Sequence, residues 1–329
     1  FVLIALSSAL RTLGYHDIRP DMIVTTDPGG YAGFHLDLSG FMDIPVAMPL
    51  TGCRGVWKWN SPVLVINQGS LPERTFVESL SIPAIDIPQN GTVAGTALIL
   101  SRRLTSGPIV LAGLDMAELD TQTHSRPHAF DFFSIDLTNR INPAHSSSFI
   151  NSRKRTTEVP GGHGWRTSLP LSTYASWFGS VGRGSVDRNG VFRLNPSPIA
   201  MEGLPTVTGS GLAELFPESA VSFPVSFEGN PSLSEIGDRQ AIVLDLLDRL
   251  ISILRSVLDG EEPGPAFFNQ GNSNYFELVW TLETRNVLEY KKFLRKGTCG
   301  ESRSVWERTI RSCIDFFSTN RERLAHVKH

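Results

Sequence analysis

One stretch of the chain, residues 90–124, constrains the fold more than any other, because a helix start, a helix, a buried strand and a polar strand end follow one another in it. Asn90-Gly91-Thr92 has turn and N-cap chemistry, and apolar residues follow it at helical spacing. The helix ends at Ser106-Gly107-Pro108, and residues 108–112 form a short apolar run of the kind that parallel sheets bury. This order predicts an α/β fold with a parallel sheet.

Polar residues begin directly after this predicted strand, with Asp115, Glu118, Asp120 and His124. In open α/β sheets, ligands bind beyond the carboxyl ends of the strands, so chemistry is expected here. The alternative is an ordinary strand exit with solvated acids, and spacing alone does not separate the two. The first turn of the preceding helix carries Gly95 and small hydroxyl residues, so unpaired backbone N–H groups there predict a phosphate-binding position.

The first residues of the chain predict the same architecture. Residues 1–6 are expected to form a strand, residues 9–15 a helix and residues 22–25 a second strand, which implies a right-handed parallel crossover. Asp27 then lies at the carboxyl end of a strand, as Asp115 does. Two such acids can hold a divalent cation against a diphosphate or position a substrate hydroxyl. The alternative for Asp27 is a turn-forming residue before Pro-Gly.

A long polar stretch, residues 121–164, has no helical or strand periodicity and is expected to be a lid or binding loop. Its histidines suggest zinc, but their spacing matches no compact zinc motif. Pro127 also opposes the helix that would bring His124 and His128 together. Before this stretch, residues 44–50 and 63–66 predict two further buried strands.

The C-terminal part changes in composition. Regular secondary structure is predicted again after the long polar stretch, with a helix near residues 172–178 and short strands near 191–194. Three amphipathic helices, at residues 236–258, 274–294 and 302–326, then predict a helical bundle. The expected domains are a Rossmann-like core over 1–120, a loop-rich continuation and lid over 121–230, and a helical domain over 231–329.

Composition excludes several classes of protein. A formal net charge of −3 gives no electrostatic case for nucleic acid or an anionic membrane. The three cysteines lie far apart and in no metal spacing, which indicates a reducing compartment and a cytoplasmic protein. The apolar start is too short to span a bilayer, so no membrane span is expected. Because the chain begins at Phe1, we expect it to be truncated at this end.

Several motifs together resemble a known family. They are Gly-Thr-Val-Ala-Gly-Thr-Ala at 91–97, residues 108–117 followed by His124, and the acidic motif at 19–28 followed by His35. This order resembles the family that joins archaeal 6-hydroxymethylpterin diphosphokinase, or MptE, to the Maf motility accessory factors. The likeness covers roughly residues 1–130 and, more faintly, extends to about 215. It implies a Rossmann-like sheet with a sialyltransferase-like core that handles a nucleotide or nucleotide-sugar donor.

The resemblance also implies roles for individual residues. Asp27, Asp115 and His124 are the expected catalytic residues, and Asp27 and Asp115 would be metal ligands if the reaction needs magnesium. Substrate contacts are expected from Thr26, His35, Gly91, Thr92, Gly95, Thr96, Thr167 and Tyr174. For Thr167 and Tyr174 the alternative is a structural role beside an aromatic cluster.

Two chemistries compete within this family. This chain extends far beyond the shared core, as the Maf-type proteins do, so we expect a Maf-like glycosyltransferase. Such an enzyme moves a nonulosonic sugar from a CMP donor to Ser or Thr of a protein such as flagellin. The alternative is a pyrophosphokinase that transfers diphosphate from ATP to 6-hydroxymethyl-dihydropterin with Mg²⁺; no other cofactor is implied.

A third alternative comes from a different class of protein. The family normally carries a glycine-rich phosphate loop before the strand that starts at Phe1. A protein lacking that loop would be a non-catalytic nucleotide-binding or scaffolding protein.

Overall fold

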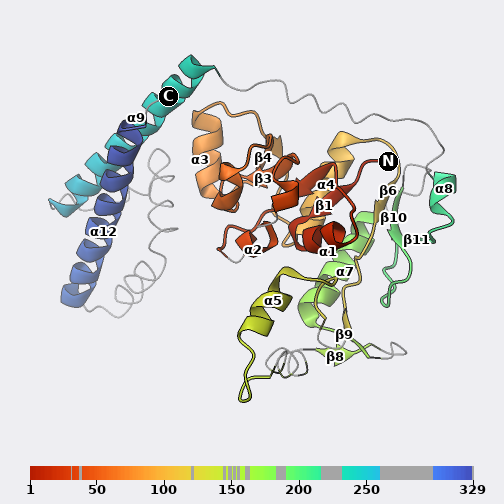
Figure 1. Cartoon of the computed structure of the whole chain (residues 1–329). Helices are drawn as coiled ribbons and strands as arrows, with labels where there is room; N and C mark the ends of the chain where they lie inside the picture. Colours follow the sequence, from red (N-terminus) through yellow and green to blue (C-terminus); the bar gives the residue numbers. More distant parts are fainter. Residues whose placement is uncertain are drawn as a thin grey trace. The chain divides into compact units, whose positions relative to one another are not determined.

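The structure is a computed structural model, shown in Figure 1. It describes residues 1–30, 32–36, 39–119, 122–143, 146, 150, 153, 156–159, 164–182, 190–215, 232–259 and 299–327. The chain divides into two compact units. Phe1–Gln68 with Ala84–Val225 forms what we call the core unit, and Gly69–Pro83 with Ser226–His329 forms the helical unit. The domain bounds expected from the sequence remain a prediction.

The core unit is built on a five-stranded sheet in the order β1-β2-β3-β4-β5. Every neighbouring pair in it is parallel, so the predicted Rossmann-like parallel sheet is confirmed. The strands are β1 (Ile4–Leu6), β2 (Met22–Val24), β3 (Val46–Pro49), β4 (Val63–Asn67) and β5 (Ile85–Asp86). All residues of β2 and β3 are buried, which explains why these strands are apolar without alternation.

Short helices cover this sheet. They are α1 (Leu10–Tyr15) and α2 (Ala32–Leu36), with the 3-10 turns η1 (Ser7–Ala9), η2 (Ser39–Phe41) and η3 (Arg54–Lys58). Leu10 of α1 and Leu36 of α2 belong to one buried cluster with Ile23, Val46 and Met48 of the central strands. The predicted crossover from β1 through α1 to β2 is therefore present.

Helix α4 (Val93–Leu104) joins two sheets, because it packs against β1, β2 and β6 (Ile109–Leu111). The second sheet has the order β11-β10-β6 and is also parallel. It is completed by β10 (Val191–Leu194) and β11 (Thr206–Val207). Leu98 of α4, Val191 of β10 and Phe178 of α7 (Leu169–Gly182) share a buried cluster. The predicted strand after α4 is present but half-buried, and it lies in this second sheet.

The described parts of residues 121–164 contain more regular structure than the sequence predicts. They contain helix α5 (Ala129–Asp136) and strand β8 (Thr157–Glu158). Strand β9 (Trp165–Thr167) follows and pairs antiparallel with both β8 and β7 (Glu118–Leu119). The prediction of a stretch without regular structure was therefore wrong at these segments. Apolar residues lie on all sides of α5, so its sequence lacks amphipathic periodicity. The last described helix of the core unit is α8 (Leu212–Leu215).

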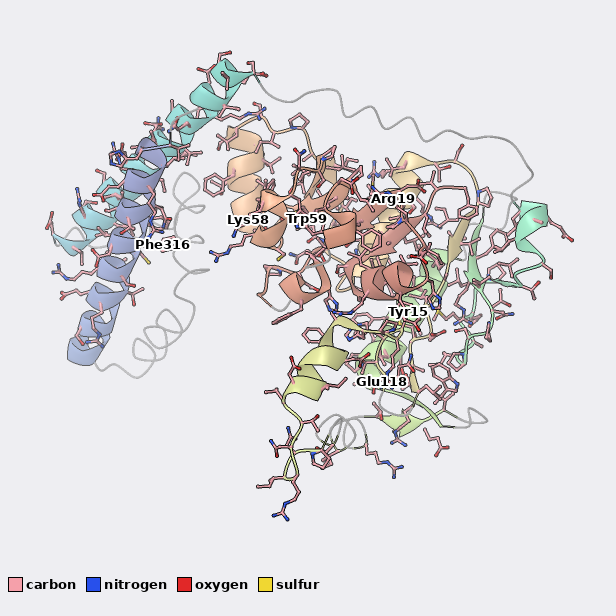
Figure 2. All side chains as sticks on the ribbon, viewed as in Figure 1. Tyr15, Arg19, Lys58, Trp59, Glu118 and Phe316 are labelled. Carbon is pink, nitrogen blue, oxygen red and sulfur yellow. The ribbon has the colours of Figure 1, made fainter. Side chains whose placement is uncertain are left out.

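The helical unit contains α3 (Leu71–Ser79), α9 (Leu233–Leu258) and α12 (Cys299–Ala325). Helices α9 and α12 pack along each other through Leu250, Leu254, Ile310 and Cys313. Phe316, labelled in Figure 2, remains 49% exposed on α12. Two of the three predicted C-terminal helices are confirmed, and the third, at 274–294, lies outside the described residues. None of the described helices has the length and apolar composition needed to cross a bilayer.

Candidate functional site

Three imidazole rings lie together, and we call them the histidine cluster. His35 comes from α2, while His124 and His128 come from the segment between β7 and α5. The rings of His124 and His128 are stacked, with centroids 4.5 Å apart and planes inclined by 12°. The His35 ring lies 5.0 Å from His128 and 6.2 Å from His124, and Phe130 touches it edge-on at 4.9 Å. The cluster therefore unites two predicted site residues, His35 and His124, with one that was not predicted.

The expectation that His124 and His128 would face each other only on a helix was wrong. The segment between them is a turn that contains a cis Arg126-Pro127 peptide bond. Thr12 of α1 holds this turn, because its hydroxyl lies 2.8 Å from the Ser125 hydroxyl and 3.2 Å from the Pro127 carbonyl oxygen. Tertiary contacts to α1 thus bring the two rings together without a helix.

The cluster keeps its imidazoles neutral near pH 7. Burial, followed by the charges of His124 and His35, lowers the pKa of His128 to about 4. Burial also lowers the pKa of His35, assisted by His124 and opposed by Asp27. Lost hydration lowers the pKa of His124, and Glu118 of β7, labelled in Figure 2, opposes that shift. Nδ1 of His35 and Nε2 of His128 are buried without a hydrogen-bond partner.

The low pKa of His128 predicts a loss of stability in mild acid. The unfolded chain has ordinary histidines that bind protons below about pH 6.5, whereas folded His128 stays neutral down to about pH 4. The unfolding free energy should therefore fall as the pH drops through this window, with about 2 kcal/mol lost by pH 5 from this group alone. Urea unfolding at pH 7.5 and pH 5 measures the loss.

His128→Asn is the matched variant for this prediction. The asparagine carbonyl can replace Nδ1 of His128 as acceptor of the Phe130 N–H, a bond of 3.3 Å, without titrating. The variant should lose clearly less stability than the wild type between the two pH values. Equal losses in both proteins would show that His128 is not responsible.

A second group of predicted residues surrounds the first turn of α4. The Thr92 side chain caps this helix by accepting the Gly95 N–H at 2.8 Å, and the Asn90 side chain accepts the Thr92 N–H at 3.2 Å. The Asn90 amide also donates to the Thr96 hydroxyl at 3.2 Å. The Gly95 N–H is therefore used by the cap and not left for a ligand, which corrects one detail of the sequence prediction. The N–H groups of Val93 and Ala94 remain without a partner inside the helix.

Gly95 and Gly91 are glycines for identifiable reasons. A Cβ at Gly95 would collide with the Asn90 side chain, which holds the cap together. Gly91 has φ of +86°, and a Cβ there would lie 3.3 Å from the ring of Tyr174 on α7. Tyr174 therefore lies against the start of α4, so the structure unites these two predicted residues.

Asp115 lies in a strained turn after β6. The next residue, Met116, has φ of +50°, which is rare for a residue with a long side chain. The Thr167 hydroxyl donates to the Met116 carbonyl oxygen at 3.0 Å and so fixes the turn. Strained backbone of this kind is often found at functional sites. Thr167 therefore has a structural contact here.

Arg193 was not among the site residues predicted from the sequence. It lies in β10 and is only 2% exposed. Burial lowers its pKa, and the nearby charge of Asp115 opposes that shift. An arginine at an inward position of an apolar strand, Val191-Phe192-Arg193-Leu194, was the signal available in the sequence.

The two predicted acids lie in different surroundings. Asp27 is exposed after β2, while Asp115 is half-buried after β6, a strand of the other sheet. Thr26 precedes Asp27 and is half-buried. Within the described residues, no group of three or more His, Cys, Asp or Glu side chains is arranged to hold a metal ion. The positive charge of Arg193 beside Asp115 also makes that carboxylate a poor ligand for a second cation.

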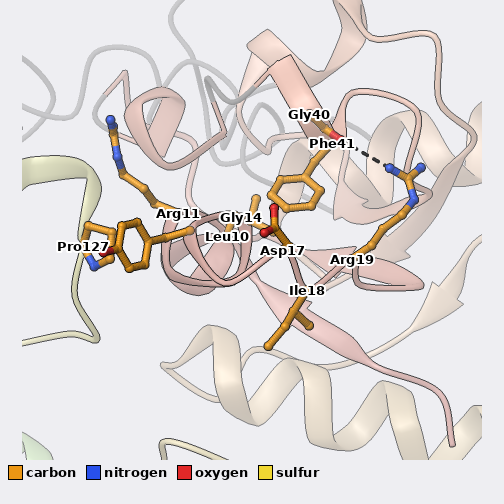
Figure 3. Close-up of a pocket in the computed structure, with 10 residues that line it drawn as sticks. Leu10, Arg11, Gly14, Asp17, Ile18, Arg19, Gly40, Phe41 and Pro127 are labelled. Atoms are coloured by element: carbon orange, nitrogen blue, oxygen red, sulfur yellow. Dashed lines mark hydrogen bonds between the residues drawn. The ribbon is translucent and has the colours of Figure 1, made fainter.

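A pocket of about 580 Å³ opens along α1 (Figure 3). Arg19 lies at one side of it and donates to the Gly40 carbonyl oxygen at 3.3 Å. The pocket is lined by Leu10, Arg11, Gly14, Tyr15, Asp17, Ile18, Arg19, Gly40, Phe41 and Pro127. None of the predicted site residues lines it, and Pro127 connects it in sequence to the histidine cluster.

Comparison with known proteins found a relative and a family model. Over 251 residues the chain is 29% identical to an uncharacterized protein of Treponema pallidum (strain Nichols), which covers 75% of this chain and 52% of that protein. The chain thus spans about half the length of this curated relative. No solved structure matches the chain. A family model described as 6-hydroxymethylpterin diphosphokinase MptE-like matches residues 1–121, so this part of the chain resembles an MptE-like domain.

Proposed function

We propose that this chain is a transferase that moves a group from a phosphorylated nucleotide donor to a hydroxyl acceptor. The MptE-like domain supports a nucleotide as the substrate. The observation that carries the proposal is the histidine cluster, in which three imidazoles with lowered pKa values lie together and the charge of Asp27, which follows β2, acts on His35. Transfer to a hydroxyl needs a group that takes up its proton, and a neutral histidine is the usual side chain for this purpose.

His124 is the proposed proton acceptor. It is the exposed member of the cluster, so an acceptor substrate can reach it. Its Nδ1 lies 3.0 Å from the Thr123 hydroxyl. With Nδ1–H donated to Thr123, Nε2 carries the lone pair that accepts the proton. The nearby charge of Glu118 stabilises the imidazolium that results.

The first turn of α4 is the proposed contact for a phosphate of the donor. Helix α4 has 12 residues, and its positive dipole end and the N–H groups of Val93 and Ala94 favour an anion at this point. Tyr174 beside Gly91 supplies an aromatic ring and a hydroxyl at the same place. Thr92, Thr96 and Asn90 fix the turn through the hydrogen bonds of the cap.

Glycosyl transfer is the first candidate for the reaction. The acceptor hydroxyl of Ser or Thr would attack the anomeric carbon of a nonulosonic sugar. The bond from that carbon to the phosphate oxygen would break, CMP would leave, and the hydroxyl proton would pass to His124. Residues beyond the matched domain support this choice, because Thr167, Tyr174 and Arg193 all lie beside predicted site residues. An extension that contributes to the site is expected of a Maf-like protein, with a protein such as flagellin as acceptor.

Diphosphate transfer is the second candidate, favoured by the description of the matched family. A hydroxymethyl oxygen of a pterin would attack the β-phosphorus of ATP, and AMP would leave. Magnesium would supply charge neutralisation of the phosphates in such a reaction. Asp27, which is exposed, fits that ion better than Asp115, which has the positive charge of Arg193 nearby.

A thermal-shift titration with CMP, CDP, ATP and GTP, each with and without magnesium, tests the proposal. A ligand at a hundredfold excess over its Kd adds about 2.7 kcal/mol of stability, which is readily measured. We expect stabilisation by the cytidine nucleotides without metal, with cytidine itself as the control that lacks phosphate. Stabilisation by ATP only with magnesium would favour diphosphate transfer. No shift with any nucleotide would overturn the proposal and favour a scaffolding protein.

A further inference from the structure

Arg193 carries a buried positive charge that no described residue satisfies. Its side chain is 2% exposed, and its Nε and Nη1 atoms have no hydrogen-bond partner. It forms no ion pair with Asp115 or with another acid in the described part of the chain, although the Asp115 carboxylate is near enough for its charge to be felt. Buried guanidinium groups normally have every donor paired, so this one requires an explanation.

The position of Arg193 in the fold favours a ligand as that explanation. Arg193 lies in β10, the central strand of its sheet, opposite Leu111 of β6 and Thr206 of β11. Leu111 is the last residue of β6, so on that side Arg193 lies level with the carboxyl end of the neighbouring strand, whereas Thr206 on the other side begins β11. Its backbone N–H donates to the Pro205 carbonyl oxygen at 2.8 Å, which fixes the strand on the β11 side. The carboxyl ends of the strands are where parallel sheets bind their ligands.

We propose that Arg193 binds a phosphate group of the substrate with its guanidinium, whose Nε–H and Nη1–H have no partner among the described residues. The planar guanidinium holds its charge and its N–H donors in a fixed arrangement that suits phosphate oxygens. Nε–H and Nη1–H point to different sides of the plane's Nε–Cζ bond, so they would bind different oxygens. The identity of that substrate as a nucleotide rests on the proposed function, whereas phosphate binding by Arg193 does not. Asp115 would lie next to the bound phosphate, within reach of the reacting groups, and its negative charge limits how tightly the phosphate binds.

Inorganic diphosphate is the probe, and melting temperature is the measured quantity. We expect diphosphate to stabilise the wild type and Arg193→Met to abolish this shift. Without ligand, the same variant should melt about 2–4 °C higher than the wild type, because a methionine of similar length removes an unpaired buried charge. If Arg193 only stabilised the fold, Arg193→Met would instead lower the melting temperature of the ligand-free protein. Arg193→Lys should weaken diphosphate binding about tenfold to a hundredfold, because lysine keeps the charge but not the fixed planar arrangement of several N–H donors.

Arg19→Met is the matched control. Arg19 is exposed and already paired with Asp43 at 2.6 Å, and its loss should leave the diphosphate shift unchanged. A diphosphate shift that persists in Arg193→Met would overturn the proposal, as would its absence in the wild type. Stabilisation by malonate but not by diphosphate would also overturn it, in favour of a carboxylate ligand. Should Arg193→Met fail to fold, an unchanged diphosphate affinity in Arg193→Lys would overturn it.

The two proposals fail separately. A diphosphate shift that depends on Arg193, without a shift or turnover with any nucleotide, would leave the phosphate site standing and remove the nucleotide transferase. Transfer from a nucleotide that continues unimpaired in Arg193→Met would leave the nucleotide transferase standing and remove the phosphate site at Arg193.

Discussion

Asp115→Asn is expected to lower the transfer rate at least about a hundredfold while leaving the fold intact. Asp115 is half-buried in the turn after β6 and has no hydrogen bond that the fold depends on among the described contacts, so an amide of the same size should be tolerated. The carboxylate is needed to position the acceptor hydroxyl beside the donor phosphate. Release of free nucleotide, measured with the donor that gives the largest thermal shift, checks the prediction.

The same variant should bind diphosphate at least as tightly as the wild type. Removing the negative charge beside Arg193 removes a repulsion that the bound phosphate would feel. The combination of lost turnover and retained phosphate binding separates a role in transfer from a role in donor binding. Asp43→Asn is the matched control, because Asp43 is exposed and pairs with Arg19 away from the predicted site residues. Unchanged turnover in Asp115→Asn would remove Asp115 from the proposed mechanism.

Phe178→Ala is expected to destabilise the core unit by about 3–5 kcal/mol. Phe178 is 0% exposed, and its ring joins α7 to α4, β6 and β10 through one apolar cluster. Removal of the ring leaves a cavity that those elements cannot close, because the backbone of α7 already packs tightly. A Cβ at Gly179 or Gly182 would collide with the carbonyl oxygens of Glu202 or Gly203. Chemical denaturation of the full chain measures the change.

Phe316→Ala provides the comparison for Phe178→Ala. Phe316 is 49% exposed on α12, so its loss should cost less than about 1 kcal/mol. Because α7 also presents Tyr174 to Gly91, Phe178→Ala should weaken nucleotide binding in addition to stability. A loss of stability no larger than that of Phe316→Ala would show that α7 is not held by this cluster.

Local patterns in the sequence were sufficient for most of the regular elements. Thr92 predicted the start of α4, and the apolar runs at β2, β3 and β4 predicted parallel strands, because cap chemistry and buried strands depend mainly on neighbouring residues. Helix α5 was missed because its apolar residues lie on all sides, so the period of 3.6 residues that identifies an amphipathic helix is absent.

By itself the sequence determined the parallel α/β core, the capped helix α4 and the acids that follow β2 and β6. Tertiary structure alone decided which residues meet. His35 lies far along the chain from His124 and His128, and only contacts such as that of Thr12 with Ser125 bring their rings together. The isolation of Arg193 was likewise invisible in the sequence, because burial and missing partners depend on how β10 packs between β6 and β11. Local preference acts over a few residues, whereas a site depends on the packing of distant segments.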